Sequence, residues 1–204
     1  MPKIVDIESR RAAFVAASLD VIAAEGLGAA TMRRIAARAG VTTGAITHYF
    51  ENREALLIEA VTAAHYAAGA RMQDAARRQS VAADRLEAVV LEALPLDPVR
   101  LREWRVWSAF RGALPGNALL WTQNELGYGA WRQLLQTLLE PVCGAAAADV
   151  RREATLLVAL IDGVGFRLAA MTGSEQLAAE QQSAAADVRA YLKAIGDRCR
   201  AKHP

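Results

Sequence analysis

The segment that most constrains what this chain can fold into runs from Thr31 to Phe50, with the sequence TMRRIAARAGVTTGAITHYF. Thr31 has the hydroxyl of a good N-cap, and the helical pattern after it stops at Gly40, where the backbone needs positive φ to leave the helix. Thr42 can cap a second helix, in which Ile46 faces inward at the spacing that packs it across the first. The segment therefore predicts a helix-turn-helix.

The outward side of the second helix carries small and polar side chains that can enter the major groove of DNA. We expect Thr43, Gly44 and Ala45 to lie nearest the base edges. Phosphate and mixed contacts are expected from residues around the two helices: Thr31, Arg33, Thr42, Thr47, His48, Tyr49 and Arg53. The alternative is structural, since two short Ala-rich helices joined at a glycine occur in many helical proteins. The long amphipathic helix before the motif favours DNA binding.

The formal net charge of +2 is too small to indicate nucleic-acid binding, but the distribution of the basic residues is informative. Several lie at the ends and outer faces of the first helices: Lys3, Arg10, Arg11, Arg33, Arg34, Arg38 and Arg53. This arrangement suits local phosphate contacts and not a general affinity for polyanions. Taken singly, an arginine of this kind is more often a solvated surface residue.

The residues from Gly40 to Ile46, then Tyr49-Phe50 and Asn52 to Leu56, resemble the N-terminal domain of TetR-type transcriptional regulators. The resemblance is specific in this region and weak after about Ala64. The version ITHYF is closest to the choline-responsive BetI-type branch. At Thr47 the chain departs from the family, which most often has a tyrosine there that contacts the DNA backbone.

The rest of the chain also has a helical pattern, and no strand-like alternation persists anywhere. The residues are 53% hydrophobic but only 6% aromatic, which suits packed Ala-rich helices. Caps, glycines and prolines predict helices over residues 7–25, 32–39, 43–49, 53–79, 83–94, 100–114, 117–140, 149–172 and 178–200. We expect Asn117 to cap the seventh of these and Pro141 to end it. With the resemblance, this predicts an all-α protein: a DNA-binding head over residues 1–52, joined by a long helix to a ligand-binding and dimerisation domain over residues 53–204.

Several other protein classes are disfavoured by what the sequence lacks. No apolar run reaches the roughly twenty residues needed to cross a bilayer, and the N-terminal segment has no apolar signal core. Cys143 and Cys199 are far apart and without metal-ligand company, so we expect reduced thiols in a cytoplasmic protein. His48, His65 and His203 have no partners at catalytic or metal-binding spacing, so neither an enzyme nor a cofactor or metal site is expected.

Large aromatic side chains concentrate in the middle of the C-terminal domain. We expect them to form an effector pocket from Trp104, Trp107, Phe110, Trp121, Glu125, Tyr128 and Trp131. Aromatic faces beside a carboxylate from Glu103, Glu125 or Asp162 attract a quaternary ammonium ion. The BetI-type resemblance implies the same choline-like class of ligand. The alternative is that these rings fill the core of an otherwise Ala-rich domain.

The last two helices have more apolar width than one internal core face requires. We expect a dimer interface formed by Leu157, Leu160, Ile161, Val164, Leu168, Val188, Leu192 and Ile195. Gly163 and Gly165 would let another helix approach closely. The resemblance implies a four-helix interface with two helices from each subunit, and the alternative is that these side chains are all internal core.

These features favour a homodimeric repressor that binds double-stranded DNA at a palindromic operator and releases or resets its grip when a small molecule binds. The rival outside the enzymes is a helical module whose head contacts protein. Salt dependence separates the two, because phosphate contacts release counterions and an apolar protein interface does not.

Overall fold

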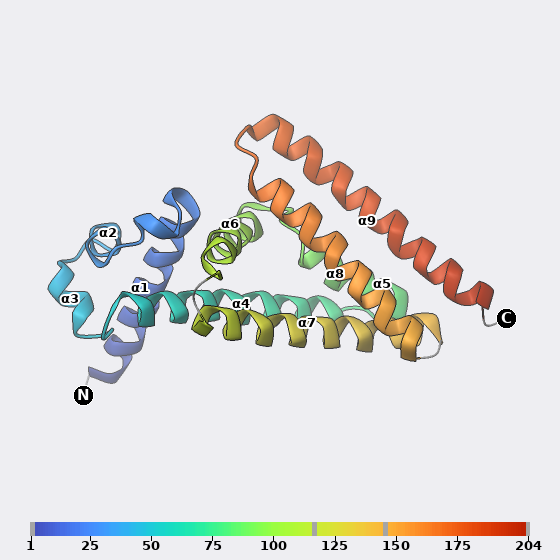
Figure 1. Cartoon of the computed structure of the whole chain (residues 1–204), viewed down its shortest axis with the longest axis horizontal. Coiled ribbons are helices and arrows are strands. Elements are labelled where there is room, and N and C mark those ends of the chain that lie inside the picture. Colours follow the sequence, from blue (N-terminus) through green and yellow to red (C-terminus); the bar gives the residue numbers. More distant parts are fainter. Residues whose placement is uncertain (1–2, 116–117, 145–146, 203–204) are drawn as a thin grey trace. The chain divides into compact units, whose positions relative to one another are not determined.

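The computed structural model describes residues 3–115, 118–144 and 147–202 of the 204-residue chain. Within these ranges the regular elements are all helical (Figure 1). They are α1 Lys3–Glu25, the 3₁₀ turn η1 Leu27–Ala29, α2 Met32–Arg38, α3 Thr43–Thr47, α4 Arg53–Arg77, α5 Ala82–Glu92, α6 Pro98–Ala113, α7 Ala118–Cys143, α8 Ala147–Ala169 and α9 Ser174–Lys202. The predicted all-α fold is confirmed for this part of the chain.

The helices pack into two compact units. The head unit consists of the described residues of 1–67 and 102–121, and the body unit consists of the described residues of 68–101 and 122–204. The head unit therefore contains α1 to α3, the first part of α4 and most of α6. The predicted functional boundary after residue 52 stays a prediction, but the packing adds α6 to the group of helices around the helix-turn-helix.

The core of the head unit is continuous from the helix-turn-helix to α6. Ile35 of α2, Ile46 of α3 and Leu56 of α4 are fully buried in one cluster. Val106 and Phe110 of α6 belong to the same cluster, at 0% and 5% exposure. Burial of apolar surface is the main stabilising term in folding. Because α6 contributes side chains to the same apolar core as the helix-turn-helix, both are stabilised by that core.

Most helix bounds lie within a few residues of the predicted ones. α9 begins at Ser174 rather than at Ala178, because the Leu177 N–H donates to the Gly173 carbonyl at 2.9 Å and closes an earlier turn. The predicted cap at Asn117 lies outside the described residues.

The prediction that α7 ends before Pro141 was wrong. The helix continues through Pro141 to Cys143 and ends where Gly144 takes a φ of 54°. The Gly144 N–H donates to the Glu140 carbonyl at 2.9 Å, so the turn that contains the proline is still closed. A proline in the last turn removes few hydrogen bonds, and burial of Leu139 and Cys143 keeps this turn packed.

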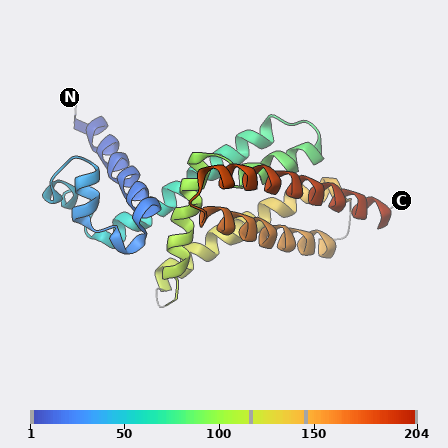
Figure 2. The ribbon, with the colours of Figure 1, turned by 90° about the horizontal axis from the view of Figure 1, so that it is seen from above.

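In the body unit, α8 and α9 lie side by side along their lengths (Figures 1 and 2). α9 also packs against α5. Among the described helices, none is both long and apolar enough to cross a membrane.

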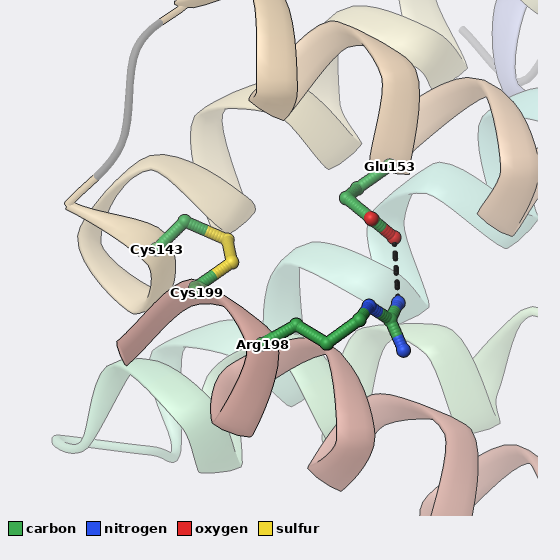
Figure 3. Close-up of a disulfide and its surroundings, with 4 residues drawn as sticks. All are labelled: Cys143, Glu153, Arg198 and Cys199. Carbon is green, nitrogen blue, oxygen red and sulfur yellow. Dashed lines mark hydrogen bonds and ion pairs between the residues drawn. A yellow bond between two sulfur atoms is a disulfide. The ribbon is translucent and has the colours of Figure 1, made fainter. Parts of the chain in front are cut away.

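The expectation of two separate reduced thiols was also wrong, because Cys143 and Cys199 are joined in a disulfide (Figure 3). Their Cα atoms are 4.8 Å apart although 56 residues separate them in the sequence. The chain reverses direction between α8 and α9, which returns the last turns of α9 to the end of α7. Distance along the chain was a poor guide to distance in space.

Candidate nucleic-acid interface and effector site

The segment Thr31–Phe50 has the geometry of a helix-turn-helix. The Thr31 hydroxyl oxygen accepts a hydrogen bond from the Arg34 backbone N–H at 3.1 Å, which caps α2 as predicted. Gly40 has a φ of 71°, a left-handed conformation that glycine adopts without strain. The Val41 N–H then donates to the Ala36 carbonyl at 3.0 Å and closes the end of α2. Thr42 stands at the N-cap of α3, but its side chain makes no capping hydrogen bond.

The outer side of α3 is exposed, as reading of base edges requires. Exposed residues in and beside this short helix are Thr42, Thr43, Gly44, Thr47 and His48, while Ala45 and Tyr49 are half-buried. The Thr47 hydroxyl donates to the Gly44 carbonyl at 2.9 Å. Its proton is therefore used inside α3, and its free lone pairs cannot bind a phosphate oxygen as a donor would.

The arginines of α2 differ in how far they are already engaged. Arg33 is exposed and makes no ion pair or hydrogen bond within the described residues. Arg34 holds Glu25 at 2.7 Å, and the hydrogen bond between them lowers the pKa of Glu25 and raises that of Arg34. Arg38 pairs with Asp20 at 3.0 Å. Of these three, Arg33 is the cation most available to a phosphate.

Arg53 is used inside the head unit. Its Nε donates to the Ala30 carbonyl at 2.8 Å and its Nη2 donates to the Leu27 carbonyl at 2.6 Å. The guanidinium is half-buried and holds the turn before α2 against the start of α4. The sequence indicated a phosphate contact here, and the structure supplies a different role, which is to position the helix-turn-helix.

Two further contacts that sequence reasoning missed hold the head unit together. Arg11 of α1 forms an ion pair with Glu59 of α4, donates to the Tyr49 carbonyl at 2.6 Å and lies 4.4 Å from the centre of the Phe50 ring. It thereby links α1, the end of the helix-turn-helix and α4. No spacing in the sequence predicts such a contact, because the residues that form it lie on three separate segments of the chain.

The second is a shared carboxylate. Asp20 of α1 lies 3.0 Å from Arg38 of α2 through Oδ2 and 2.9 Å from Arg102 of α6 through Oδ1. Arg102 also donates to the Ala16 carbonyl at 3.2 Å. A single side chain therefore connects the first helix of the helix-turn-helix to α6.

Two of the predicted effector residues, Trp104 and Trp107, contact each other in the head unit. Trp104 is 5% exposed and meets Trp107 edge to face, with ring centres 5.4 Å apart. His65 of α4, which the sequence did not single out, stacks on Trp107 with ring centres 5.5 Å apart and an interplanar angle of 16°. Loss of water around the ring lowers the pKa of His65, although the residue keeps part of its surface in solvent. The buried indole Nε1 of Trp107 has no hydrogen-bond partner within the described residues.

Of the other predicted effector residues, Glu125, Tyr128 and Trp131 belong to the body unit, whereas Phe110 and Trp121 belong to the head unit. In the body unit the half-buried Tyr128 donates through its hydroxyl to Asp162 at 2.7 Å, and Trp131 is also half-buried. Trp121 is 54% exposed and Glu125 is exposed. Phe110 fills the core of the head unit. For Phe110 the core-filling alternative therefore describes the observed packing.

The predicted dimer residues are mostly internal. Six of the eight are at most 7% exposed in the single chain: Leu157, Ile161, Leu168, Val188, Leu192 and Ile195. These six side chains pack inside the single chain and leave little surface for another, so their place in a dimer interface stays a prediction. Leu160 and Val164 are half-buried. The outward faces of the same helices instead present Leu156, Ala159, Gly163, Ala179, Ala186 and Ala190.

The described residues form only helices, and an exposed α3 in a helix-turn-helix is the architecture of a DNA-binding regulator. The profile of bacterial regulatory proteins of the tetR family matches residues 14–60, and the profile of the BetI-type transcriptional repressor C-terminal region matches residues 82–197. The chain belongs to the TetR family of bacterial transcriptional regulators. Proteins of this family are DNA-binding regulators rather than enzymes.

Relatives of known name extend over most of the chain. It is 32% identical to the transcriptional regulator PksA of Bacillus subtilis, over 81% of this chain and 82% of PksA. It is also 32% identical to the regulator BetI of Paraburkholderia phytofirmans, over 82% of this chain and 85% of BetI. Both are described as HTH-type transcriptional regulators.

Solved structures show the same fold. A transcriptional regulator from Rhodococcus is similar with a TM-score of 0.76 and 27% identity, covering 89% of this chain and 95% of that one. A regulator from Saccharomonospora viridis in complex with choline has a TM-score of 0.75 at 21% identity, covering 87% and 94%. The regulator FadR from Bacillus subtilis in complex with stearoyl-CoA has a TM-score of 0.69 at 21% identity, covering 86% and 96%.

Proposed function

We propose that this regulator is a cytoplasmic homodimeric repressor that binds a palindromic operator and is released by a small organic cation. The observation that carries the DNA-binding part is the exposed outer side of α3, which is held by a capped and fully packed helix-turn-helix. Two such helices related by a twofold axis enter successive major grooves about 34 Å apart. In this arrangement Thr43, Gly44 and Ala45 read base edges.

Backbone contacts would come from the margin of the same surface. Arg33 is exposed and unpaired within the described residues, and it supplies a free cation for a phosphate. Thr31, Thr42, His48 and Tyr49 stay candidates for phosphate or mixed contacts, and Thr47 becomes one only if its hydroxyl turns away from the Gly44 carbonyl. Arg53 contributes to the same function indirectly, by holding the turn that precedes α2.

For the homodimer we propose the outward faces of α8 and α9 in place of their buried faces. Leu156 is 44% exposed and, with Ala159 and Gly163, follows one side of α8. Ala186 and Ala190 continue a similar face on the neighbouring α9. Small side chains allow two helix backbones to approach closely, and Leu156 supplies apolar area that a second copy would bury. Two helices from each subunit then form the interface.

For the effector, the support comes from the group formed by Trp104, Trp107 and His65. Electron-rich indole faces attract cations, and the lowered pKa of His65 disfavours the protonated ring that would repel one. The similar regulator from Saccharomonospora viridis was solved with choline, whereas FadR was solved with stearoyl-CoA. The aromatic group favours the cation over the acyl chain as the class of ligand.

The DNA-binding test uses a DNA duplex selected in vitro for binding to the parent protein. The affinities of three variants for this duplex are compared with that of the parent. We expect Thr43→Ala and His48→Ala to weaken binding to this duplex while their thermal unfolding stays at the parent value, because both side chains are exposed. Ala83→Ser, at an exposed position of α5, is the matched control and should bind as the parent does. Parental affinity in both α3 variants would remove α3 from the interface.

The effector test is titration calorimetry with choline and with its neutral carbon isostere, 3,3-dimethylbutan-1-ol. We expect binding of choline and a loss of roughly 0.5–2 kcal/mol for the isostere, the range of one cation–π contact. Trp107→Leu should remove the preference between the two compounds. If the parent binds choline and the isostere equally well, or binds neither compound, the result would contradict a cationic effector and favour an uncharged one.

A further inference from the structure

The two cysteines of the chain meet at one end of the body unit. Cys143 is the last residue of α7 and Cys199 lies near the end of α9. Each is 5% exposed, and their Cα atoms are 4.8 Å apart. This Cα separation is in the range that a disulfide spans without movement of the backbone.

The last turns of α9 are held from two sides at this point. The disulfide ties them to α7, and Arg198 forms an ion pair with Glu153 of α8 at 3.0 Å (Figure 3). The covalent bond closes a loop that contains α8 and nearly all of α9. Without it, the contacts described at this end include a partly exposed ion pair and the buried side chains of α9, and helix ends have few backbone hydrogen bonds of their own.

We propose that Cys143 and Cys199 form a reversible thiol–disulfide site whose oxidant is a low-molecular-weight disulfide. The thiolate of one cysteine attacks the small disulfide, whose S–S bond breaks as a mixed disulfide forms, and the departing small thiolate takes up the proton. The second cysteine attacks the mixed disulfide and releases a second small thiol. Two protein thiols are thus oxidised by two electrons while one small disulfide is reduced to two thiols.

The site acts on the surface that we assign to dimer formation. α9 provides half of the proposed interface, so this consequence rests on the proposed homodimer. In the oxidised protein the far end of α9 is fixed to α7, and its outward face is presented in one position. In the reduced protein the same end opens more often, so a second copy binds a less ordered face and dissociates more readily.

The experiment equilibrates the full chain in buffers that span ratios of reduced to oxidised glutathione. Alkylation under denaturing conditions followed by mass measurement counts free thiols, and thermal unfolding is recorded in each buffer. We expect both thiols to disappear together as oxidised glutathione increases. The oxidised protein should carry no alkyl group and no glutathione, and its mass should be two hydrogen atoms below that of the unmodified reduced chain. The unfolding midpoint rises over the same range of ratios, and the dimer dissociation constant from sedimentation falls.

Two variants complete the test. Cys199→Ser should lose the response of the midpoint to glutathione. Ala185→Ser, which disturbs a buried position of α9 but keeps both cysteines, should be less stable than the parent and still respond. If Cys199→Ser does not fold, the titration of the parent decides alone.

The outcomes separate the two proposals. Two free thiols in folded parent protein under excess oxidised glutathione, or a midpoint that is the same in all buffers, overturns the thiol–disulfide site. A chain that stays monomeric in every buffer but changes its midpoint with glutathione supports the site and overturns the homodimer.

Discussion

The most informative single side chain to test is Arg53, because the sequence and the structure indicate different roles for it. The sequence indicated a phosphate contact. In the structure the guanidinium donates to the carbonyls of Leu27 and Ala30 from a half-buried position. A phosphate contact changes DNA affinity and leaves folding alone, whereas a link inside the head unit changes folding first.

The structure sets the size of the effect. A hydrogen bond that involves a charged group contributes about 1.5–3 kcal/mol, and the lower part of that range suits a site that keeps contact with water. Removing both bonds in Arg53→Ala should therefore lower the free energy of unfolding by roughly 3 kcal/mol, twice the lower value. Arg53→Lys keeps the charge but not the two-pronged donor, so it should lose about half as much.

The assay is urea unfolding together with the salt dependence of binding to the selected duplex, with Arg33→Ala as the matched control. Arg33 has no partner within the described residues, so its replacement should change stability by no more than about 0.5 kcal/mol. It should flatten the plot of log affinity against log salt by about one unit. If Arg53→Ala keeps the parent's urea midpoint and instead shows that change in slope, the structural role is refuted.

Three further results are expected. Asp20→Asn should lower the free energy of unfolding by about 1 kcal/mol, since exposed ion pairs contribute about 0.2–1 kcal/mol each, and a double-mutant cycle with Arg102→Ala should show coupling; additive losses would mean that the ion pair contributes nothing. Leu156→Glu should convert the dimer into a folded monomer, whereas Leu157→Glu should unfold the chain itself. Sedimentation and circular dichroism distinguish these two results. A Leu156→Glu protein that stays dimeric would place the interface elsewhere. Because the pKa of His65 is lowered in the folded protein, the unfolded chain takes up a proton first as the pH falls below 6.5. The free energy of unfolding should therefore decline below that pH in the parent, and this contribution to the decline should be absent in His65→Gln. Equal pH dependence of the two proteins would contradict the lowered pKa.

A large part of this protein could be predicted from local sequence. The helix-turn-helix followed from Thr31, Gly40 and Ile46, because caps, positive-φ glycines and inward spacing depend only on residues within a few positions of each other. The Asn52 side chain caps α4 in the same local way, accepting from the Ala55 N–H at 2.9 Å. Helix order and class followed for the same reason.

Predictions failed or stayed open where the answer depends on what faces a helix. The apolar stripe of α8 could be predicted, but nothing in its spacing could decide whether Leu157 packs within the subunit or against a second one. Leu157 is buried in the single chain, whereas the neighbouring Leu156 is 44% exposed.

The contacts that join distant segments were decided by the tertiary structure alone. Asp20, Arg38 and Arg102 come from three helices, and Cys143 meets Cys199 only because the chain turns back between α8 and α9. A sequence determines which side chains can cap, turn or become buried within one helix, because those properties depend on neighbours along the chain. The partner of a charge or a thiol depends on how whole helices pack, and in this protein only the folded structure determines it.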